Sequence, residues 1–211
     1  MAYLLDVLFR YAHIVFGVTW IGLLYYFNFV QTEYIKEADD AGKADVMAKL
    51  APRALWWFRW AAMFTFLTGV VLLWWVASQE RYNLGISLGA LMGTLMMLNV
   101  WLIIWPNQKV MIGLAEGDKA VAGPKAALAS RTNTLLSLPM LYFMVASVHG
   151  LAASGGTETS TPALIIGLVI IAAIELNAIF GKMLGAIQSV SAVITSSIVL
   201  AVIMAGLVNY I

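Results

Sequence analysis

The sequence predicts an all-α fold, a polytopic transmembrane bundle of about six helices that forms a single domain over residues 1–211. Only 11% of the residues are charged, whereas 62% are hydrophobic. In a soluble domain about a quarter of all residues are charged, because the domain must cover a water-facing surface. Six apolar segments are also long enough to cross roughly 30 Å of hydrocarbon. The chain is therefore expected to be a multi-pass protein with the lipid bilayer as its solvent.

The predicted spans are separated by segments whose composition is typical of loops. Residues 31–53 contain five acidic and four basic side chains. Residues 106–131 contain two prolines and three glycines, and residues 154–161 consist mainly of Ser, Gly and Thr. Only three residues, 181–183, separate the last two spans. The spans are predicted at about residues 4–30, 54–77, 84–105, 134–153, 162–180 and 184–210.

The basic residues predict the orientation of the bundle, because Lys and Arg are retained on the cytoplasmic side of a membrane. Nine of the twelve basic residues lie in segment 31–53, in segment 106–131 or at Lys182. The opposite side has only Arg10 and Arg81. We therefore expect these loops to lie in the cytoplasm and both termini to lie outside, in the inner membrane of a bacterium.

Composition also limits the cofactors and partners. The net charge is +1 and there is no basic run, so nucleic acid is not expected as a partner. The chain contains no cysteine. Disulfides, Cys-ligated zinc, iron–sulfur clusters and covalently attached c-type haem are thereby excluded.

The two histidines of the chain, His13 and His149, both lie in predicted spans. The predicted topology places both in the outer half of the membrane, His13 about 10–14 Å and His149 about 6 Å from the outer helix end. Two imidazoles from different helices can ligate one haem iron, and Gly17 and Gly150 leave room for a flat ring. The alternative is that each histidine hydrogen-bonds a neighbouring helix. The difference in depth favours that alternative.

Glu175 and Asn177 lie inside the fifth predicted span. A carboxyl group at membrane depth is costly and is usually functional. Glu175 is thus a candidate for proton relay or cation binding. The alternative is a neutral carboxyl group that is hydrogen-bonded to Asn99, in the middle of the third span, or to a serine.

A second group of polar residues gathers at the expected cytoplasmic face. It includes Arg59, Asn107, Arg131 and Asn133, and such a density of guanidinium and amide groups could hold an anionic or heterocyclic ligand. The alternative is that these side chains cap helix ends and extend to lipid headgroups.

Gly85, Gly89 and Gly93 repeat every fourth residue along the third span. Small residues at this spacing permit close approach of two helix backbones in a membrane. We interpret the strip as a packing surface without catalytic content.

Four stretches carry a resemblance to a known family. They are His13 to Gly22, Trp56-Trp57-Phe58-Arg59-Trp60, Trp105-Pro-Asn-Gln-Lys109, and Arg131-Thr-Asn-Thr-Leu-Leu-Ser-Leu-Pro139. Together they resemble the N-terminal membrane domain of the bacterial membrane-bound urate hydroxylases, in which that domain is fused to a C-terminal cytochrome c. The resemblance covers about residues 5–185.

This resemblance implies a membrane redox module, and it strengthens the prediction that His13 and His149 hold a haem b non-covalently. The fused enzymes are longer and contain a haem-c module, whereas this chain has no cysteine. A separate subunit is therefore expected to supply or accept the electrons.

Three functions follow as hypotheses. The first is a haem-b membrane redox subunit, an oxidoreductase component that exchanges electrons with a cytochrome c or a respiratory complex. The second is a urate or purine hydroxylase that uses a separate cytochrome. The third is a non-redox accessory subunit, packed against other membrane subunits, or a small transporter. A b-type visible spectrum would separate the first two from the third.

Overall fold

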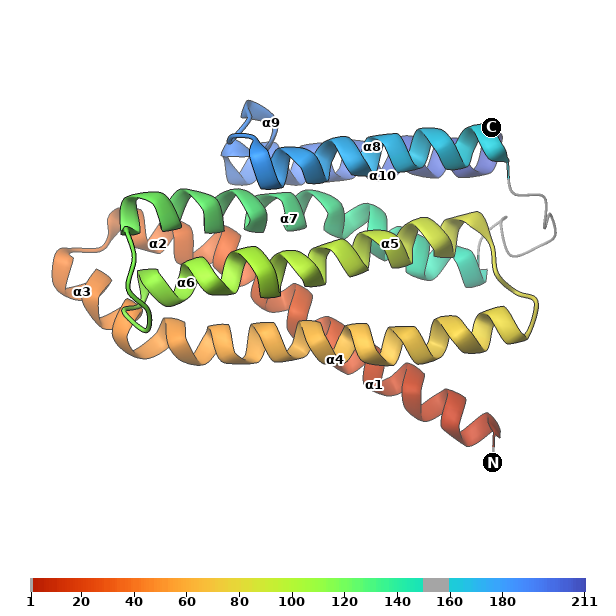
Figure 1. The fold of residues 1–211 in the computed structure, drawn as a ribbon, viewed down its shortest axis with the longest axis horizontal. Coiled ribbons are helices and arrows are strands. Elements are labelled where there is room, and N and C mark those ends of the chain that lie inside the picture. Colours follow the sequence, from red (N-terminus) through yellow and green to blue (C-terminus); the bar gives the residue numbers. More distant parts are fainter. Residues whose placement is uncertain (1, 150–159) are drawn as a thin grey trace.

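The protein is described by a computed structural model that covers residues 2–149 and 160–211 (Figure 1). The predictions for Gly150 and for residues 154–159 fall outside the described residues. Within the described ranges the chain is helical and contains no strand, which confirms the all-α fold class.

Several long helices contain short π-helical segments, labelled η, across which the helix continues without a non-helical residue. Thus α1, η1 and α2 form one continuous helix, as do α3, η2 and α4, and likewise α5, η3 and α6. The segments are α1 Ala2–Tyr25, η1 Tyr26–Gln31, α2 Thr32–Glu37, α3 Asp40–Asp45, η2 Val46–Leu50, α4 Ala51–Ser78, α5 Leu84–Leu98, η3 Asn99–Ile104, α6 Trp105–Met111, α7 Lys119–His149, α8 Thr161–Phe180, α9 Gly185–Gln188 and α10 Val190–Tyr210.

Five of the described helices are long and apolar enough to cross a membrane, by length and composition. They correspond to the first, second, third, fifth and sixth predicted spans. Their bounds are Tyr3–Glu37, Asp40–Ser78, Leu84–Met111, Thr161–Phe180 and Val190–Tyr210.

The charged segment 31–53 is mostly helical rather than a loop, so the spans on either side of it extend further than predicted. The side chain of Asp39 accepts a hydrogen bond from the Gly42 backbone N–H and so begins α3. Lys36 pairs with Glu33 one turn away. Ion pairs at this spacing support helices, and Lys and Glu are themselves good helix formers. Charge density therefore marked the end of the apolar run but not the end of the helix.

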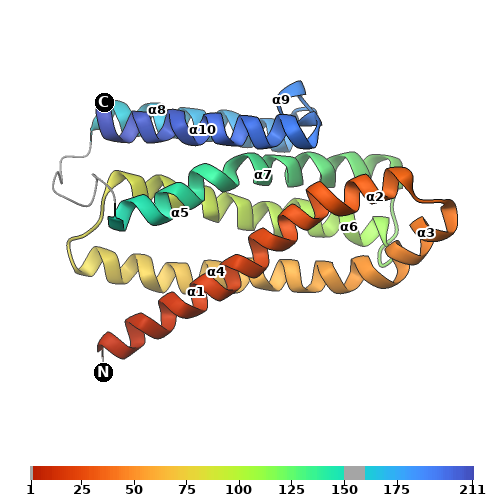
Figure 2. The ribbon, with the colours of Figure 1, turned by 180° about the vertical axis from the view of Figure 1, so that it is seen from behind.

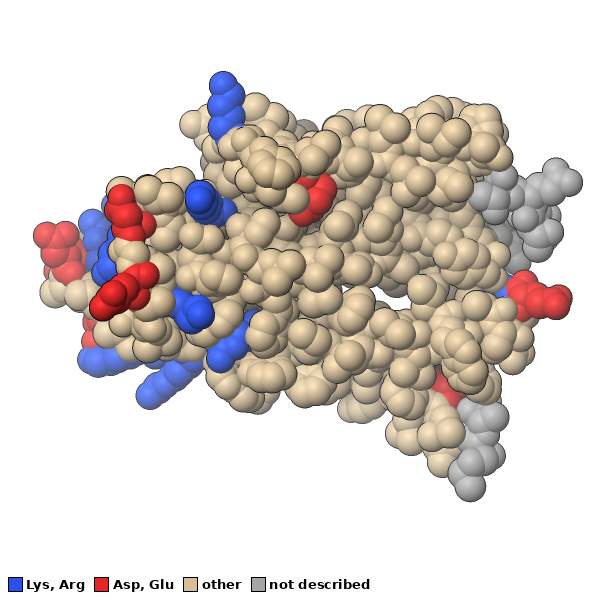
Figure 3. All heavy atoms as spheres, in the orientation of Figure 1, with Lys and Arg blue, Asp and Glu red and all other residues tan. Residues whose placement is uncertain are grey.

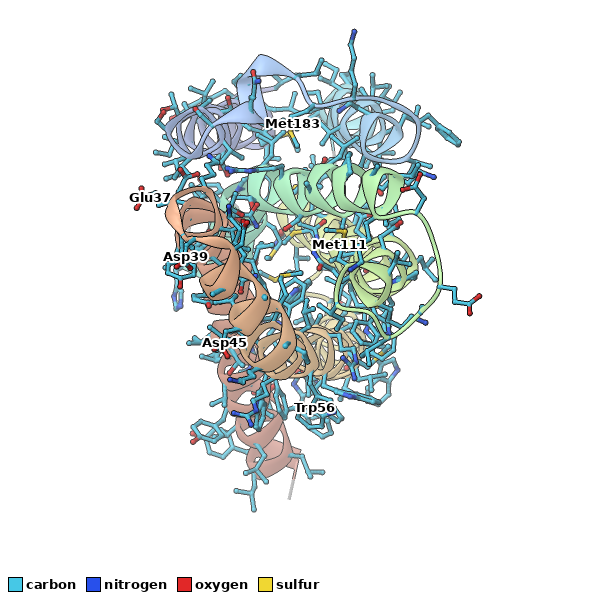
Figure 4. All side chains as sticks on the ribbon, turned by 90° about the vertical axis from the view of Figure 1, so that its left-hand side faces the viewer. Glu37, Asp39, Asp45, Trp56, Met111 and Met183 are labelled. Atoms are coloured by element: carbon cyan, nitrogen blue, oxygen red, sulfur yellow. The ribbon has the colours of Figure 1, made fainter. Side chains whose placement is uncertain are left out.

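Helix α7 lies in the middle of the bundle, and it begins fifteen residues before the predicted fourth span. It packs against α5, α6, α10 and η3, with further contacts to α1 and α8. Seen from one end, it runs between the α8–α10 pair and the remaining helices (Figure 4). Because most of its central turns pack against other helices, α7 can bury polar side chains that find their partners within the protein.

The long helices lie side by side along the long axis of the molecule, with α1 crossing the others obliquely (Figures 1 and 2). Most Lys, Arg, Asp and Glu side chains gather at the end that contains α2, α3 and α6 (Figure 3). The two termini lie at the opposite end (Figure 2). The segments predicted to face the cytoplasm therefore share one end of the bundle.

The glycine strip on α5 packs against α7. A Cβ atom added at Gly89 would lie 3.0 Å from Cβ of Phe143, and one added at Gly85 would lie 3.2 Å from its ring. Phe143 itself is buried. This close approach confirms that the strip is a packing surface.

Candidate functional site

Buried polar side chains concentrate on two turns of α7, residues 130–137, which we call the α7 polar stretch. Arg131, Thr132, Asn133, Thr134 and Ser137 are all buried. Buried polar groups usually find hydrogen-bond partners within the protein. The side chains of this stretch have two sets of partners.

The first set of partners comes from η3 and α8. Asn99 Nδ2 donates to Asn133 Oδ1 at 3.0 Å and to Glu175 Oε2 at 3.1 Å. Asn133 Nδ2 in turn donates to the Met96 carbonyl oxygen at 2.9 Å. This Asn99–Asn133–Glu175 network contains the bond between Asn99 and Glu175 that the sequence predicts as one form of the alternative to a functional carboxyl group. It joins three helices around one carboxyl group, which can take up or release a proton.

The second set of partners comes from α1 and η1. Tyr25 Oη and Ser137 Oγ are 2.8 Å apart, and Asn28 Nδ2 donates to Ser130 Oγ at 2.8 Å. Sequence reasoning did not identify these four residues. Two signals could have found them. Ser130 and Ser137 are seven residues apart and so share a face of α7, and Asn28 is a polar residue inside an apolar run.

Two of the three π-helical segments carry residues of this site. Asn28 lies in η1, and Asn99 begins η3. A π-helical turn contains an extra residue, shifts the faces of the helix that follows, and occurs frequently at functional sites. Both segments flank the α7 polar stretch, so their irregular geometry coincides with the buried polar groups.

Arg131 is the charged member of the stretch. It is only 5% exposed, and its Nη1 is fully buried without a hydrogen-bond partner among the described residues. Gln31 Oε1, at the end of η1, is likewise buried and unpartnered there. A buried guanidinium without a partner is destabilising. The arrangement is therefore suited to receiving an anion.

The other predicted polar residues hold helix ends in place. The Arg59 guanidinium lies over the Trp105 ring at 3.9 Å, and Asn107 Nδ2 donates to the Ile103 carbonyl oxygen of its own helix at 2.7 Å. Asn177 exchanges two hydrogen bonds with the Lys182 backbone at the end of α8. No hydrogen bond in the described residues joins these three side chains to Arg131.

His13 is held by α4. Its Nδ1 lies 2.9 Å from the Thr65 carbonyl oxygen and 3.1 Å from Thr68 Oγ1. A carbonyl oxygen can only accept, so Nδ1 carries the proton and Nε2 keeps its lone pair. Metal-ligating histidines are commonly fixed in this way. Gly69 makes room for the imidazole ring, since a Cβ added there would lie 3.0 Å from His13 Cε1. That Gly17 leaves room for a haem stays a prediction.

His149 lies exposed at the end of α7. Helix α1 diverges from α7 toward its N-terminus (Figures 1 and 2). The described structure contains no group of three or more His, Asp or Glu side chains arranged to hold a metal ion. That His13 and His149 ligate one haem iron stays a prediction.

Comparison with known proteins identifies a family. The family described as urate oxidase N-terminal matches residues 82–208, more than half of the chain. This region includes α5 to α8 and most of α10, and therefore the α7 polar stretch and the Asn99–Asn133–Glu175 network. Searches of curated proteins and of solved structures found no match. The chain belongs to the urate oxidase N-terminal family.

Proposed function

We propose that this chain is the membrane domain of an oxidoreductase that hydroxylates urate or a similar purine and passes the electrons to a separate acceptor. The observation that carries the proposal is the position of the Asn99–Asn133–Glu175 network inside the region that matches the family. A bundle needs no partly buried carboxyl group merely to pack its helices, because apolar and small residues do that at lower cost.

The proposed reaction balances as a two-electron oxidation. The oxygen atom added to the purine comes from water, two protons are released, and two electrons leave in single steps to one-electron acceptors such as a c-type cytochrome. The Glu175 carboxyl group can take up one of the protons. Asn99 and Asn133 present amide groups that hold that carboxyl group in place.

The test is the disappearance of urate without oxygen, in membranes that contain the full chain and an added one-electron acceptor. Glu175→Gln keeps the shape and the bond to Asn99 but cannot take up a proton, so kcat should fall by about 10²-fold or more, as for other general bases. Asn177→Ala, on the same helix, is the matched control and should retain the wild-type rate. If wild-type membranes consume no urate with any acceptor, the proposal fails. If Glu175→Gln matches the wild type, Glu175 has no role in proton transfer.

A second candidate function is a haem-b redox subunit that exchanges electrons with a cytochrome c or a respiratory complex. The arrangement of His13, with Nδ1 bonded and Nε2 available, favours it. When bound, haem would carry single electrons. We expect His13→Ala and His149→Ala each to remove a reduced b-type absorption band. A wild-type protein without such a band would exclude this candidate.

For the location, we propose a multi-pass protein of the bacterial inner membrane with six spans and both termini outside. Five apolar helices support it. We assign the remaining span, the fourth in chain order, to α7, which runs beside them through the core (Figure 1). The charged end would then face the cytoplasm, in agreement with the excess of basic residues there.

A further inference from the structure

We propose that Arg131 anchors a binding site for a small planar organic monoanion where α7 meets η1 and α2. The choice of urate as the representative anion rests on the proposed function. The anion site itself is independent of that function, because we infer it from the buried guanidinium and its unpartnered Nη1.

The state of Arg131 is the first argument. The side chain is 95% removed from solvent, yet no hydrogen bond to its guanidinium occurs in the described structure, and Nη1 is completely enclosed. A guanidinium has five N–H donors and cannot be neutralised by losing a proton in a protein. Nη1 therefore has N–H donors that no described residue accepts, and an anionic ligand is the acceptor that suits a guanidinium best.

The face of α7 that carries Arg131 also carries apolar residues that pack against other segments. Arg131 lies three residues after Leu128 and four before Leu135, so all three side chains share one face of α7. Those two leucines belong to a small cluster completed by residues of η1, α9 and α10, namely Phe29, Ile187 and Val193. Apolar walls beside a single cation suit a flat organic anion better than a strongly hydrated inorganic one.

Gln31 supplies a second polar atom of the opposite kind. It lies two residues after Phe29, on the helix segment that Asn28 bonds to Ser130, the neighbour of Arg131. Its Oε1 is buried and has no donor in the described structure. A ligand that offers an anionic edge to Arg131 and a ring N–H to Gln31 would satisfy both atoms. Urate has both features, whereas sulfate has no N–H donor.

Glu33 is the protein group that could instead balance Arg131. Its charge acts on the guanidinium, and α2, which contains it, lies beside α7 at the charged end (Figure 4). However, Glu33 Oε1 accepts a hydrogen bond from Lys36 Nζ at 2.8 Å, and the described residues contain no ion pair between Glu33 and Arg131. Glu33 thus moderates the charge without occupying the site. Removing its negative charge should leave anion binding intact or tighten it.

The experiment is a calorimetric titration of the purified full chain in detergent micelles. Urate is the ligand in one titration and sulfate in another. Arg131→Gln should weaken urate binding by about 10-fold to 100-fold, the loss expected for a hydrogen bond to a charged group. Arg131→Lys should bind urate with an affinity between those of the wild type and Arg131→Gln, because lysine keeps the charge but lacks the planar guanidinium. Arg53→Gln, an exposed arginine at the same end, is the matched control and should bind as the wild type does. Glu33→Gln should bind urate at least as tightly as the wild type.

If Arg131→Gln does not fold, Gln31→Leu tests the same site and should weaken urate binding. The proposal is overturned if wild-type protein shows no saturable urate binding, or if the Arg131 and Gln31 variants bind urate with unchanged Kd. Sulfate binding as tight as urate binding would overturn the ligand class. Urate binding that depends on Arg131 but is never followed by hydroxylation would refute the proposed function and leave the binding site standing. Hydroxylation with an unchanged KM in Arg131→Gln would refute the binding site and leave the proposed function standing.

Discussion

Replacing Asn99 by leucine should destabilise the bundle, because one amide group serves two acceptors on two other helices. The change removes the 3.0 Å bond to Asn133 and the 3.1 Å bond to Glu175, while side-chain volume stays similar. Interhelical hydrogen bonds in membrane bundles contribute about 0.6 kcal/mol on average and up to about 1.7 kcal/mol. Two such bonds predict a loss of about 1–3 kcal/mol. Reversible unfolding in mixed detergent micelles, followed by tryptophan fluorescence, measures it.

A control and a double-mutant cycle make this prediction specific. Thr94→Val, on the same helix, removes only a bond to the Ala90 carbonyl oxygen one turn away, and should change stability by less than about 0.5 kcal/mol. Combining Asn99→Leu with Glu175→Leu should give a coupling energy of about 0.5 kcal/mol or more. If Asn99→Leu unfolds like the wild type, or if the two changes are additive, the network does not hold these helices together.

Two further predictions concern packing and orientation. Gly89→Val should destabilise the α5–α7 contact by about 1–3 kcal/mol in the same unfolding assay, because even a Cβ there would lie 3.0 Å from a buried side chain. The control is Gly22→Ala, whose added Cβ would meet nothing within 4 Å. This variant should have the stability of the wild type. Equal stability of these two variants would contradict the close packing. With the charged end in the cytoplasm, Ala41→Cys should resist a membrane-impermeant thiol reagent in intact cells and Glu80→Cys should react. The reverse pattern would invert the proposed topology.

Hydrophobicity alone was enough to predict the helical class and the positions of most spans, because each outer helix must be apolar over its full width. It placed the start of α7 too late. This helix is enclosed by other helices, so its buried face tolerates Arg131 and Asn133, residues that reduce the apolar signal. The helical extension through segment 31–53 was also missed. Its ion pairs and the Asp39 cap stabilise helix in water as well as at a membrane surface.

The site could be predicted only in part. Glu175 and Asn133 attract attention because they are polar residues in apolar segments, and a bond between Asn99 and Glu175 was one of the alternatives. The enclosure of Arg131 depends on how η1, α9 and α10 meet α7, which no local pattern encodes. The same holds for the histidines. Their positions in two predicted spans suggested a pair, whereas the hydrogen bond of His13 to the Thr65 carbonyl oxygen on α4 follows from the packing of α1 against α4.

The most direct measurement of the central claim is the stoichiometry of urate oxidation under argon by membranes that contain this chain, supplied with purified c-type cytochrome in isotope-labelled water. A urate hydroxylase domain predicts reduction of two molecules of cytochrome for each urate consumed, with the label from water incorporated into the hydroxylated purine. Membranes without the chain should show neither. Absence of urate-dependent cytochrome reduction, or urate loss that requires oxygen and yields hydrogen peroxide, would contradict the account.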